Sequence, residues 1–330
     1  MNRQTLIKQL LAGKANKPAQ LSAGAYAPTN IALVKYWGKR DKELNLPVTG
    51  SMSISLADKG AHTSVSLTDR AHDEIIINAK AAARESKFVQ RLIAFLDLLR
   101  PNATVHYRID TKVNIPIAAG LASSACGFAA LIKAFNQFYG WQLPDEILSI
   151  LARIGSGSAS RSIYEGFVEW HQGERSDGLD SYAEALPYSW PDLRIGLLIF
   201  TDAEKSIGST EAMLRTVQTS RLYSAWPRQV AEDLVKMKQA LAVHNFALLG
   251  QTAEQNALSM HATMFSAWPP ICYAGKATLE AMHKIWRLRN EGLALYFTED
   301  AGPNLKLLFQ ARDEALVKDH FSNLEVVSPF

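Results

Sequence analysis

A loop of small residues between a predicted strand and a predicted helix is the strongest constraint on this fold. Residues 104–114, TVHYRIDTKVN, read as a strand, and residues 116–127 read PIAAGLASSACG. Ser123 or Ser124 can cap a helix that continues to about Tyr139. Unpaired N–H groups and the helix dipole favour phosphate at such a helix start. The loop lacks the G-K-S/T ending of a Walker loop, and an ordinary Gly/Ser loop with an N-cap explains it equally well.

Alternating apolar and hydroxyl residues predict strands before this loop. Residues 51–57, SMSISLA, and 62–68, HTSVSLT, alternate as half-buried strands do, and the DKG between them predicts a hairpin turn. Residues 74–79, EIIINA, read as another strand, and residues 81–100 have helical spacing. The apolar stripe of this predicted helix comprises Phe88, Leu92, Phe95 and Leu99.

The second half of the chain contains more helix. Residues 144–155, PDEILSILARIG, begin with Pro-Asp-Glu and end with Gly, which predicts a helix capped at both ends. GFVEW and LRIGLLIF read as strands, and the pattern is mainly helical from about residue 203. LALYFT at 293–298 predicts a late strand, and LKLLFQARDEALVKDHF predicts a helix after it. This order is typical of an α+β fold rather than of regular βαβ alternation.

The chain divides into an N-terminal extension and two predicted lobes. Residues 1–21 are basic, contain no Asp or Glu, and predict a short appended helix that ends near Gly13 rather than a secretory signal. The segment LPYSWPDL predicts a lobe boundary near 185–195. We therefore expect one lobe at 22–190 and the other at 191–330.

Composition excludes several classes of protein. The 330 residues are 48% hydrophobic, which is enough for two domains or one large two-lobed unit. The net charge of +3 gives no support for a nucleic-acid or membrane partner. No apolar run reaches the roughly 18 residues that span a bilayer. Cys126 and Cys272 lie near no second cysteine or histidine cluster, which favours a reducing cytoplasm over a disulfide or metal site.

Basic and aromatic residues gather in APTNIALVKYWGKRD, residues 27–41. Lys35, Tyr36, Lys39 and Arg40 lie within six residues of one another. Lys35 follows the apolar run IALV, where a lysine is partly desolvated unless it is paired. Alternatively, this segment is only the solvated basic end of a strand. The mixture of charged and aromatic side chains favours a functional role over that interpretation.

An arginine and an aspartate stand in two further loops of small residues. Arg161 lies in GSGSASRS, where its planar fork suits a carboxylate or phosphate. The alternative is a flexible turn with a structural salt bridge to Glu165 or Glu169. Asp300 ends a predicted strand in YFTEDAGPN, beside a sharp Ala-Gly-Pro turn. A base at a strand end and a carboxylate that only caps the next turn explain it equally well.

Together these four segments resemble a known family. PIAAGLASSA resembles the phosphate-binding motif of the GHMP kinase superfamily, and APTNIALVKYWGKRD, GSGSASRSIYEGFVEW and YFTEDAGPN are similar to diphosphomevalonate decarboxylases. The resemblance runs in order from about residue 25 to the C-terminal region. It implies a two-lobed α+β fold, with an N-terminal lobe like domain 2 of ribosomal protein S5, a ferredoxin-like C-terminal lobe and the site between them.

The resemblance also implies an activity. The family uses ATP and Mg²⁺ to convert mevalonate 5-diphosphate to isopentenyl diphosphate, ADP, phosphate and carbon dioxide in isoprenoid biosynthesis. The resemblance also implies a homodimer. By position, Asp300 matches the catalytic aspartate, Lys35 the lysine beside it, and Arg161 the arginine that holds the substrate carboxylate. The positions that match substrate contacts are Tyr36, Lys39, Ser158 and Ser209. Those that match the ATP loop are Gly120, Leu121, Ala122, Ser123 and Ser124, with Ser124 also a magnesium ligand.

Other functions stay open at this point. A mevalonate 5-phosphate decarboxylase, a small-molecule kinase of the superfamily and a non-catalytic ligand sensor share the motifs to different degrees. Asp300 and Lys35 are both present, which favours a decarboxylase over a kinase or a sensor. Glu165 and Gly50 depart from the family pattern, and His261 is expected to be packed rather than to act as an acid.

Overall fold

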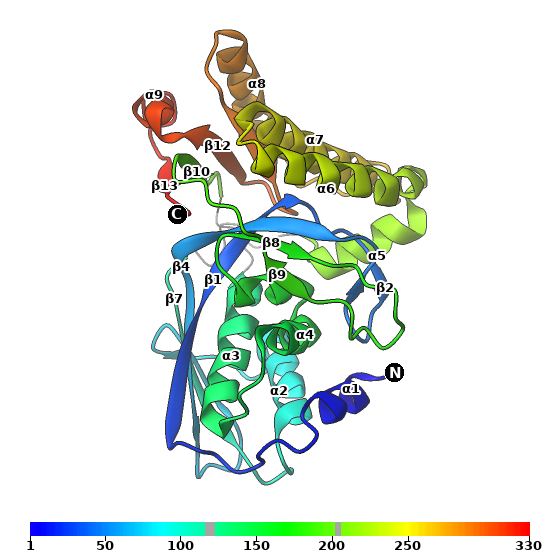
Figure 1. The fold of residues 1–330 in the computed structure, drawn as a ribbon, viewed down its shortest axis with the longest axis vertical. Coiled ribbons are helices and arrows are strands. Elements are labelled where there is room, and N and C mark those ends of the chain that lie inside the picture. Colours follow the sequence, from blue (N-terminus) through cyan, green and yellow to red (C-terminus); the bar gives the residue numbers. More distant parts are fainter. Residues whose placement is uncertain (116–122, 202–205) are drawn as a thin grey trace.

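One long strand organises the N-terminal lobe. The computed structural model describes residues 1–115, 123–201 and 206–330. In it, β1 (Ser22–Val34) pairs antiparallel with β4 (Ser51–Leu67), the central strand of a seven-stranded sheet (Figure 1). The rest of this sheet, in the order β6-β5-β7-β4-β8-β9, comprises β5 (Glu74–Ile77), β6 (Lys80–Ala81), β7 (Tyr107–Val113), β8 (Phe167–Trp170) and β9 (Ala183–Ala185). A separate two-stranded ribbon consists of β2 (Lys39–Asp41) and β3 (Leu46–Pro47).

The hairpin predicted at residues 51–68 is wrong, because both halves belong to the single strand β4. Each half pairs with β1, and a register shift between Pro28 and Asn30 accommodates the residues between them. Gly60, expected in a turn, lies inside the strand. A Cβ there would lie 2.2 Å from the Ala27 carbonyl oxygen, so glycine permits close strand contact rather than chain reversal.

Helices cover one side of this sheet. They are α1 (Arg3–Leu10), α2 (Lys87–Leu99), α3 (Ser123–Tyr139) and α4 (Asp145–Gly155), followed by the 3-10 helix η1 (Gly157–Ile163). Phe88, placed on the predicted stripe of α2, is exposed, and Val89 and Leu96 join the buried face instead. The cap predicted at Gly155 is also wrong. Gly155 is the last residue of α4, and a Cβ there would clash with the Phe128 ring.

The N-terminal extension packs firmly on the first lobe. The predicted short helix is confirmed as α1, with Leu6 and Ile7 buried. The Lys14 ammonium donates to the carbonyl of Trp141, whose indole N–H donates to the carbonyl of Ala15, both at 2.8 Å. Burial and these hydrogen bonds make residues 1–15 part of the lobe surface.

The C-terminal lobe is built on a four-stranded antiparallel sheet. Its order is β11-β12-β10-β13, from β10 (Leu193–Leu198), β11 (Tyr296–Glu299), β12 (Leu305–Gln310) and β13 (Glu325–Val327). The accompanying helices are α5 (Ser209–Thr219), η2 (Arg221–Ala225), α6 (Trp226–Ala242), α7 (Phe246–Phe265), α8 (Lys276–Asn290), η3 (Ala311–Asp313) and α9 (Glu314–His320). Helices α6 and α7 lie along the first lobe and contact β1 (Figure 1). Within the described residues, no helix has the length and apolarity to cross a membrane.

The helix predicted from Leu305 is wrong over its first third. Residues 305–310 form β12, and only 314–320 form α9. Leu307 packs in one apolar cluster and Leu308 in another, so both faces of this strand are covered. A strand buried on both faces has a continuous apolar run without alternation, and such a run also fits a buried helix.

Candidate active site

Two strand ends bring Lys35 and Asp300 together. Lys35 follows β1 of the first lobe, Asp300 follows β11 of the second, and α7 packs against both strands. The Lys35 ammonium lies 2.7 Å from Oδ1 of Asp300 and also donates to the carbonyl of Ala32 at 2.8 Å. Its backbone N–H donates to the side chain of Asn256 in α7. The meeting of these two side chains, 265 residues apart, is therefore present in the fold.

A second lysine, missed in the sequence, contacts the same carboxylate. Lys306 of β12 is buried, and its ammonium lies 3.1 Å from Oδ2 of Asp300. Burial opposes ionisation of Asp300, but Lys306 and Lys35 outweigh it and hold the pKa of this carboxyl well below its usual range. Lys306 stands in the apolar run LKLLF. A lysine within an apolar run is also the signal that indicates Lys35. The apolar run around Lys306 predicts a helix instead, so the sequence gives no reason to place Lys306 beside Asp300.

Two more titratable groups lie behind Asp300. Nε2 of His261 is 3.1 Å from the backbone carbonyl oxygen of Asp300 and 3.5 Å from Oε2 of Glu299. Burial lowers the pKa of His261 to about 4, so the neutral imidazole donates to this carbonyl, as expected for a packed histidine. Burial raises the pKa of Glu299 to about 8, and its Oε1 has no hydrogen-bond partner among the described residues. Glu299 is therefore protonated at neutral pH.

Replacing Glu299 by glutamine should change how stability depends on pH. The folded pKa of about 8 lies above the ordinary 4.5, so the folded state holds this proton more tightly. Its stabilising effect is complete below about pH 4.5 and is lost as the pH rises toward 8. Glu299→Gln does not titrate, so it should become more stable than the wild type by roughly 5 kcal/mol near pH 9 and match it near pH 4.5. Urea unfolding across this range measures the difference, and parallel stability curves would contradict the assignment.

Arg161 lies in a buried polar cluster. Its guanidinium donates to the side-chain oxygens of Asn30, at 3.1 and 3.2 Å, and Ser51, at 2.7 Å, and it lies 5.9 Å from the Trp170 ring centre. Burial lowers its pKa to about 10, against the opposing effect of Asp300. No carboxylate among the described residues forms an ion pair with Arg161. This buried cation is thus available to an incoming anion.

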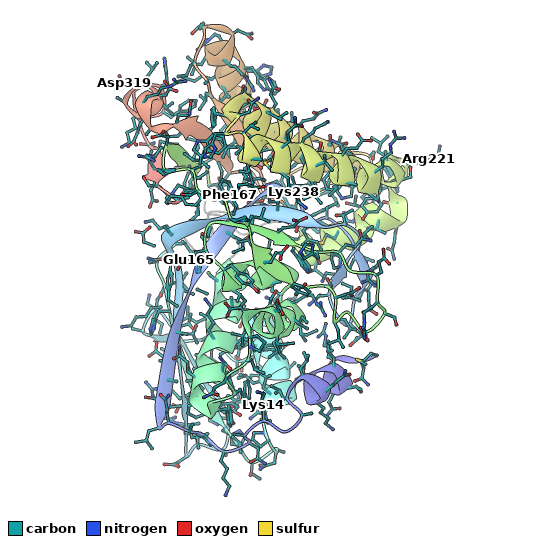
Figure 2. All side chains as sticks on the ribbon, viewed as in Figure 1. Lys14, Glu165, Phe167, Arg221, Lys238 and Asp319 are labelled. Atoms are coloured by element: carbon teal, nitrogen blue, oxygen red, sulfur yellow. The ribbon has the colours of Figure 1, made fainter. Side chains whose placement is uncertain are left out.

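The structural alternative for Arg161 is wrong. Its segment is the 3-10 helix η1 rather than a flexible turn. Glu165, labelled in Figure 2, is exposed. Glu169 forms an ion pair with Lys238 of α6 at 2.8 Å. Neither acid therefore neutralises the arginine.

Tyr36 and Ser158 border the same cluster. The Tyr36 ring packs edge-on against Trp170 at 4.8 Å, and its buried hydroxyl has no partner among the described residues. Burial raises the pKa of this hydroxyl above its usual range, so it stays protonated. A Cβ at Gly157 would lie 2.9 Å from this hydroxyl, so glycine leaves space beside it. The Ser158 carbonyl accepts from the side chain of Asn30 at 3.3 Å.

Lys39, Arg40 and Ser209 make no hydrogen bond or ion pair with this cluster among the described residues. Lys39 donates to Oδ1 of Asn45 at 2.7 Å, and burial, with nearby Arg3 and Arg91, lowers its pKa to about 8. Arg40 is exposed and donates to backbone carbonyls of residues 172–175. Ser209 is the first residue of α5 and is half-buried.

The predicted ATP loop is described only at its end. Gly120, Leu121, Ala122 and the Ser123 side chain lie outside the described residues. Because α3 begins at Ser123, Ser123 and Ser124 stand in its first turn rather than at a cap. The hydroxyl of Ser124 lies 3.4 Å from that of Ser156, the residue between the end of α4 and the start of η1. This places one hydroxyl oxygen of the loop near the end of α4.

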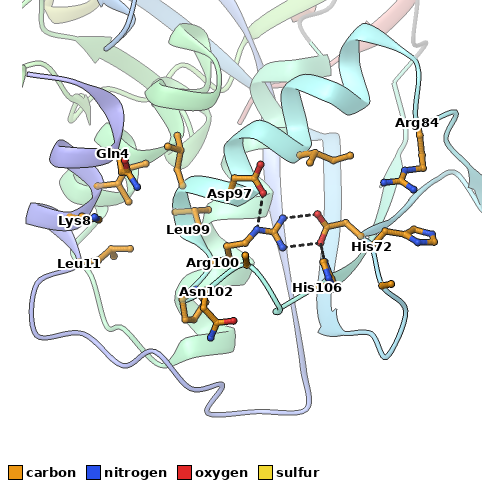
Figure 3. A pocket seen from close by; sticks show the side chains of 17 residues that line it. Gln4, Lys8, Leu11, His72, Arg84, Asp97, Leu99, Arg100, Asn102 and His106 are labelled. Carbon is orange, nitrogen blue, oxygen red and sulfur yellow. Dashed lines mark hydrogen bonds and ion pairs between the residues drawn. The ribbon is translucent and has the colours of Figure 1, made fainter.

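A cavity of about 750 Å³ lies elsewhere, between α1 and the C-terminal end of α2 (Figure 3). Arg100, on its wall, forms ion pairs with Asp73 at 2.7 Å and Asp97 at 2.8 Å. Lys8, His72 and Arg84 are among its lining residues (Figure 3). Among its described lining residues is none of the predicted site residues. The cavity is therefore separate from the cluster around Asp300.

Family models and relatives match almost the whole chain. The model described as diphosphomevalonate decarboxylase-like N-terminal domain matches residues 27–183, and that of the mevalonate 5-diphosphate decarboxylase C-terminal domain matches 195–326. The chain is 39% identical to diphosphomevalonate decarboxylase from Aspergillus fumigatus, over 88% of this chain and 77% of that protein. It is 36% identical to diphosphomevalonate decarboxylase from Homo sapiens, over 84% of this chain and 74% of that protein.

Solved structures agree with this match. The structure of MDDEF in complex with MVAPP, AMPPCP and magnesium is 39% identical, with a TM-score of 0.86 over 93% of this chain and 96% of that chain. The structure of mevalonate diphosphate decarboxylase from Staphylococcus aureus is 37% identical, with a TM-score of 0.87 over 93% of this chain and 95% of that chain. These likenesses confirm the two-lobed α+β fold that the motifs implied.

Proposed function

The chain belongs to the diphosphomevalonate decarboxylase family, and from this premise we propose that it converts mevalonate 5-diphosphate and ATP to isopentenyl diphosphate, ADP, phosphate and carbon dioxide. The observation that carries the proposal is the Lys35–Asp300 contact of 2.7 Å beside the buried, unneutralised Arg161. The electrostatic influence of Asp300 on Arg161 supports a single site with a proposed base and a proposed anion-binding cation, as the reaction requires.

Asp300 is proposed to accept the proton of the tertiary hydroxyl of the substrate. Its side chain is 26% exposed, whereas the two lysines that contact it are 2% exposed, so its accessible side faces the solvent. The lysines make it a weak base toward a free alcohol. The hydroxyl proton becomes much more acidic as its oxygen bonds to phosphorus, so transfer to Asp300 fits a late stage of phosphoryl transfer.

Arg161 is proposed to bind the substrate carboxylate. Loss of the phosphorylated hydroxyl group leaves cationic character at the tertiary carbon, and the neighbouring carboxylate supplies electrons as it leaves as carbon dioxide. A very tight ion pair would stabilise that carboxylate and oppose the step. The useful contribution of Arg161 is therefore to orient the substrate carboxylate. The hydrogen bonds that its guanidinium donates to Asn30 and Ser51 hold it in place for this role.

The described end of the loop fits ATP with a magnesium ion. The Ser124 hydroxyl stands in the first turn of α3, where helix N–H groups favour phosphate and where a hydroxyl oxygen is a suitable ligand for a hard cation. A relative was solved with AMPPCP and magnesium, which supports both as ligands here. Bound magnesium would neutralise phosphate charge, and we propose Ser124 as its ligand, with Gly120 to Ser123 at the phosphates.

Lys39 is proposed to bind the substrate diphosphate, together with Tyr36, Ser158 and Ser209. Lys39→Ala should raise the KM for mevalonate 5-diphosphate by about tenfold and change kcat by less than about threefold, because a binding charge is lost rather than a reacting group. In the wild type, KM should also rise above about pH 8, where the Lys39 ammonium loses its proton. Steady-state kinetics against pH measure both effects. Lys42→Ala, an exposed neighbour, is the control, and a loss in kcat larger than the rise in KM would remove Lys39 from this role.

One assay tests the function. Purified protein is incubated with ATP, magnesium and either mevalonate 5-diphosphate or mevalonate 5-phosphate, and carbon dioxide, ADP and isopentenyl diphosphate are measured. The proposal expects carbon dioxide and isopentenyl diphosphate from the diphosphate. ADP without carbon dioxide would indicate a kinase, turnover of the monophosphate alone would indicate the sister decarboxylase, and binding without turnover would indicate a sensor. A homodimer and a cytoplasmic location complete the proposal, supported by the family resemblance and the sparse cysteines.

A further inference from the structure

The carboxylate of Asp300 is held by one lysine on each oxygen. Lys35 lies 2.7 Å from Oδ1, and Lys306 lies 3.1 Å from Oδ2. Both lysines are almost completely buried, while a quarter of the Asp300 side chain is accessible. Each carboxylate oxygen therefore has a lysine on its buried side and keeps lone-pair capacity toward the open side.

The two lysines are attached to different parts of the molecule. Lys35 belongs to the first lobe, so its contact with Asp300 crosses between the lobes. Lys306 belongs to β12, pairs with Thr298 of β11, and also donates to the carbonyl of Asn304 at 3.4 Å. The Asn304 side chain accepts from the N–H of Phe200 at 2.8 Å and so ties the same turn to the end of β10. Lys306 is thus part of the rigid frame that carries Asp300.

We propose that Lys306 is a positioning residue for the decarboxylase reaction: it fixes the Asp300 carboxylate and keeps it ionised from within its own lobe, independently of Lys35. This inference rests on the proposed function. Lys35 reaches the carboxylate from the other lobe, whereas Lys306 reaches it from the strand next to the one that ends at Asp300.

The surroundings of Asp300 predict what removal of Lys306 would do. The charged or titratable groups that face it are Lys35 beyond β1, Lys306 on β12, Glu299 on β11, His261 on α7 and Arg161 on η1. Glu299 and His261 are neutral near pH 7, so the lysines supply the close positive charge. Without Lys306, the carboxylate keeps Lys35 and the electrostatic influence of Arg161 but loses one contacting ammonium, so the pKa of Asp300 rises.

Lys306→Met tests the proposal, because methionine keeps an unbranched side chain of similar length in this buried position and removes the charge. We expect kcat for mevalonate 5-diphosphate to fall by about tenfold or more, and KM to change by less than about twofold. The acid limb of the pH profile of kcat/KM should move upward by about one pH unit or more. Lys318→Met removes an exposed lysine from α9 in the same lobe and is the matched control, with kinetics like the wild type.

An acid limb and kcat like those of the wild type in Lys306→Met would overturn the proposal. If this variant does not fold, Lys306→Gln is used with the same expectations. A second readout needs no turnover: carboxyl-carbon NMR of aspartate-labelled protein, in which Asp300→Asn identifies the Asp300 resonance. Its titration midpoint should rise in the Lys306 variant, and an unchanged midpoint contradicts the proposal. If the wild type releases no carbon dioxide from mevalonate 5-diphosphate, the proposed function fails, while the NMR titration still decides whether Lys306 controls Asp300.

Discussion

Asp300→Asn is expected to lower kcat by about a thousandfold while ATP still binds. Asparagine has nearly the same shape as aspartate, so the site keeps its outline, but a neutral amide cannot accept the hydroxyl proton of the substrate. Lys35 and Lys306 also lose the carboxylate that lies 2.7 and 3.1 Å from them. Two buried ammonium groups without an anion cost stability, on the order of 3 kcal/mol. Carbon dioxide release under saturating substrates measures kcat, and calorimetric titration measures ATP binding.

The control for this variant is Asp319→Asn, which neutralises an exposed aspartate of α9. Thermal unfolding of both variants separates loss of fold from loss of chemistry, because a folded and inactive Asp300→Asn protein can only be deficient in the reaction. Turnover within about tenfold of the wild type would show that another group accepts the proton. The Lys35–Asp300 contact would then be structural.

Arg161→Ala is expected to reduce carbon dioxide release by about a hundredfold. The guanidinium is nearly completely buried, donates to Asn30 and Ser51, and has no ion-pair partner among the described residues. Alanine leaves the substrate carboxylate without its fork of donors, so the breaking carbon–carbon bond samples unproductive orientations. Phosphorylation of the hydroxyl group depends on Asp300 instead and should suffer less. We therefore expect ADP to form faster than carbon dioxide, which the ratio of the two products measures.

Arg175→Ala, at an exposed arginine paired with Asp177, is the control for this variant. An increase in KM alone, with full kcat and equal amounts of ADP and carbon dioxide, would exclude orientation as the role of Arg161. Equal losses of both products would place Arg161 at the phosphorylation step. Either result would still be compatible with the family, because only the role of this residue is at issue.

Local sequence patterns were sufficient to predict the features that depend on neighbouring residues. The strand before the small-residue loop, the helix from Asp145 and the late strand before Asp300 follow from local patterns, and all are present. The motifs around Lys35, Arg161 and Asp300 identified the family, because the residue types required by the chemistry occur at their expected places. Their assigned roles and the lobe boundaries stay predictions.

Long-range contacts select which segments pair and which groups lie behind the site. DKG is a local turn signal and predicts a hairpin at residues 51–68, yet both halves pair with β1 within one continuous strand. Residues 305–310 became a strand because β10 and β11 flank them and apolar clusters cover both faces. Lys306 reaches Asp300, and Glu299 keeps its proton, only through that pairing and the burial that comes with it. Local patterns set what each segment can form, whereas burial and long-range pairing, which no short stretch contains, select the structure and set the charges of the site.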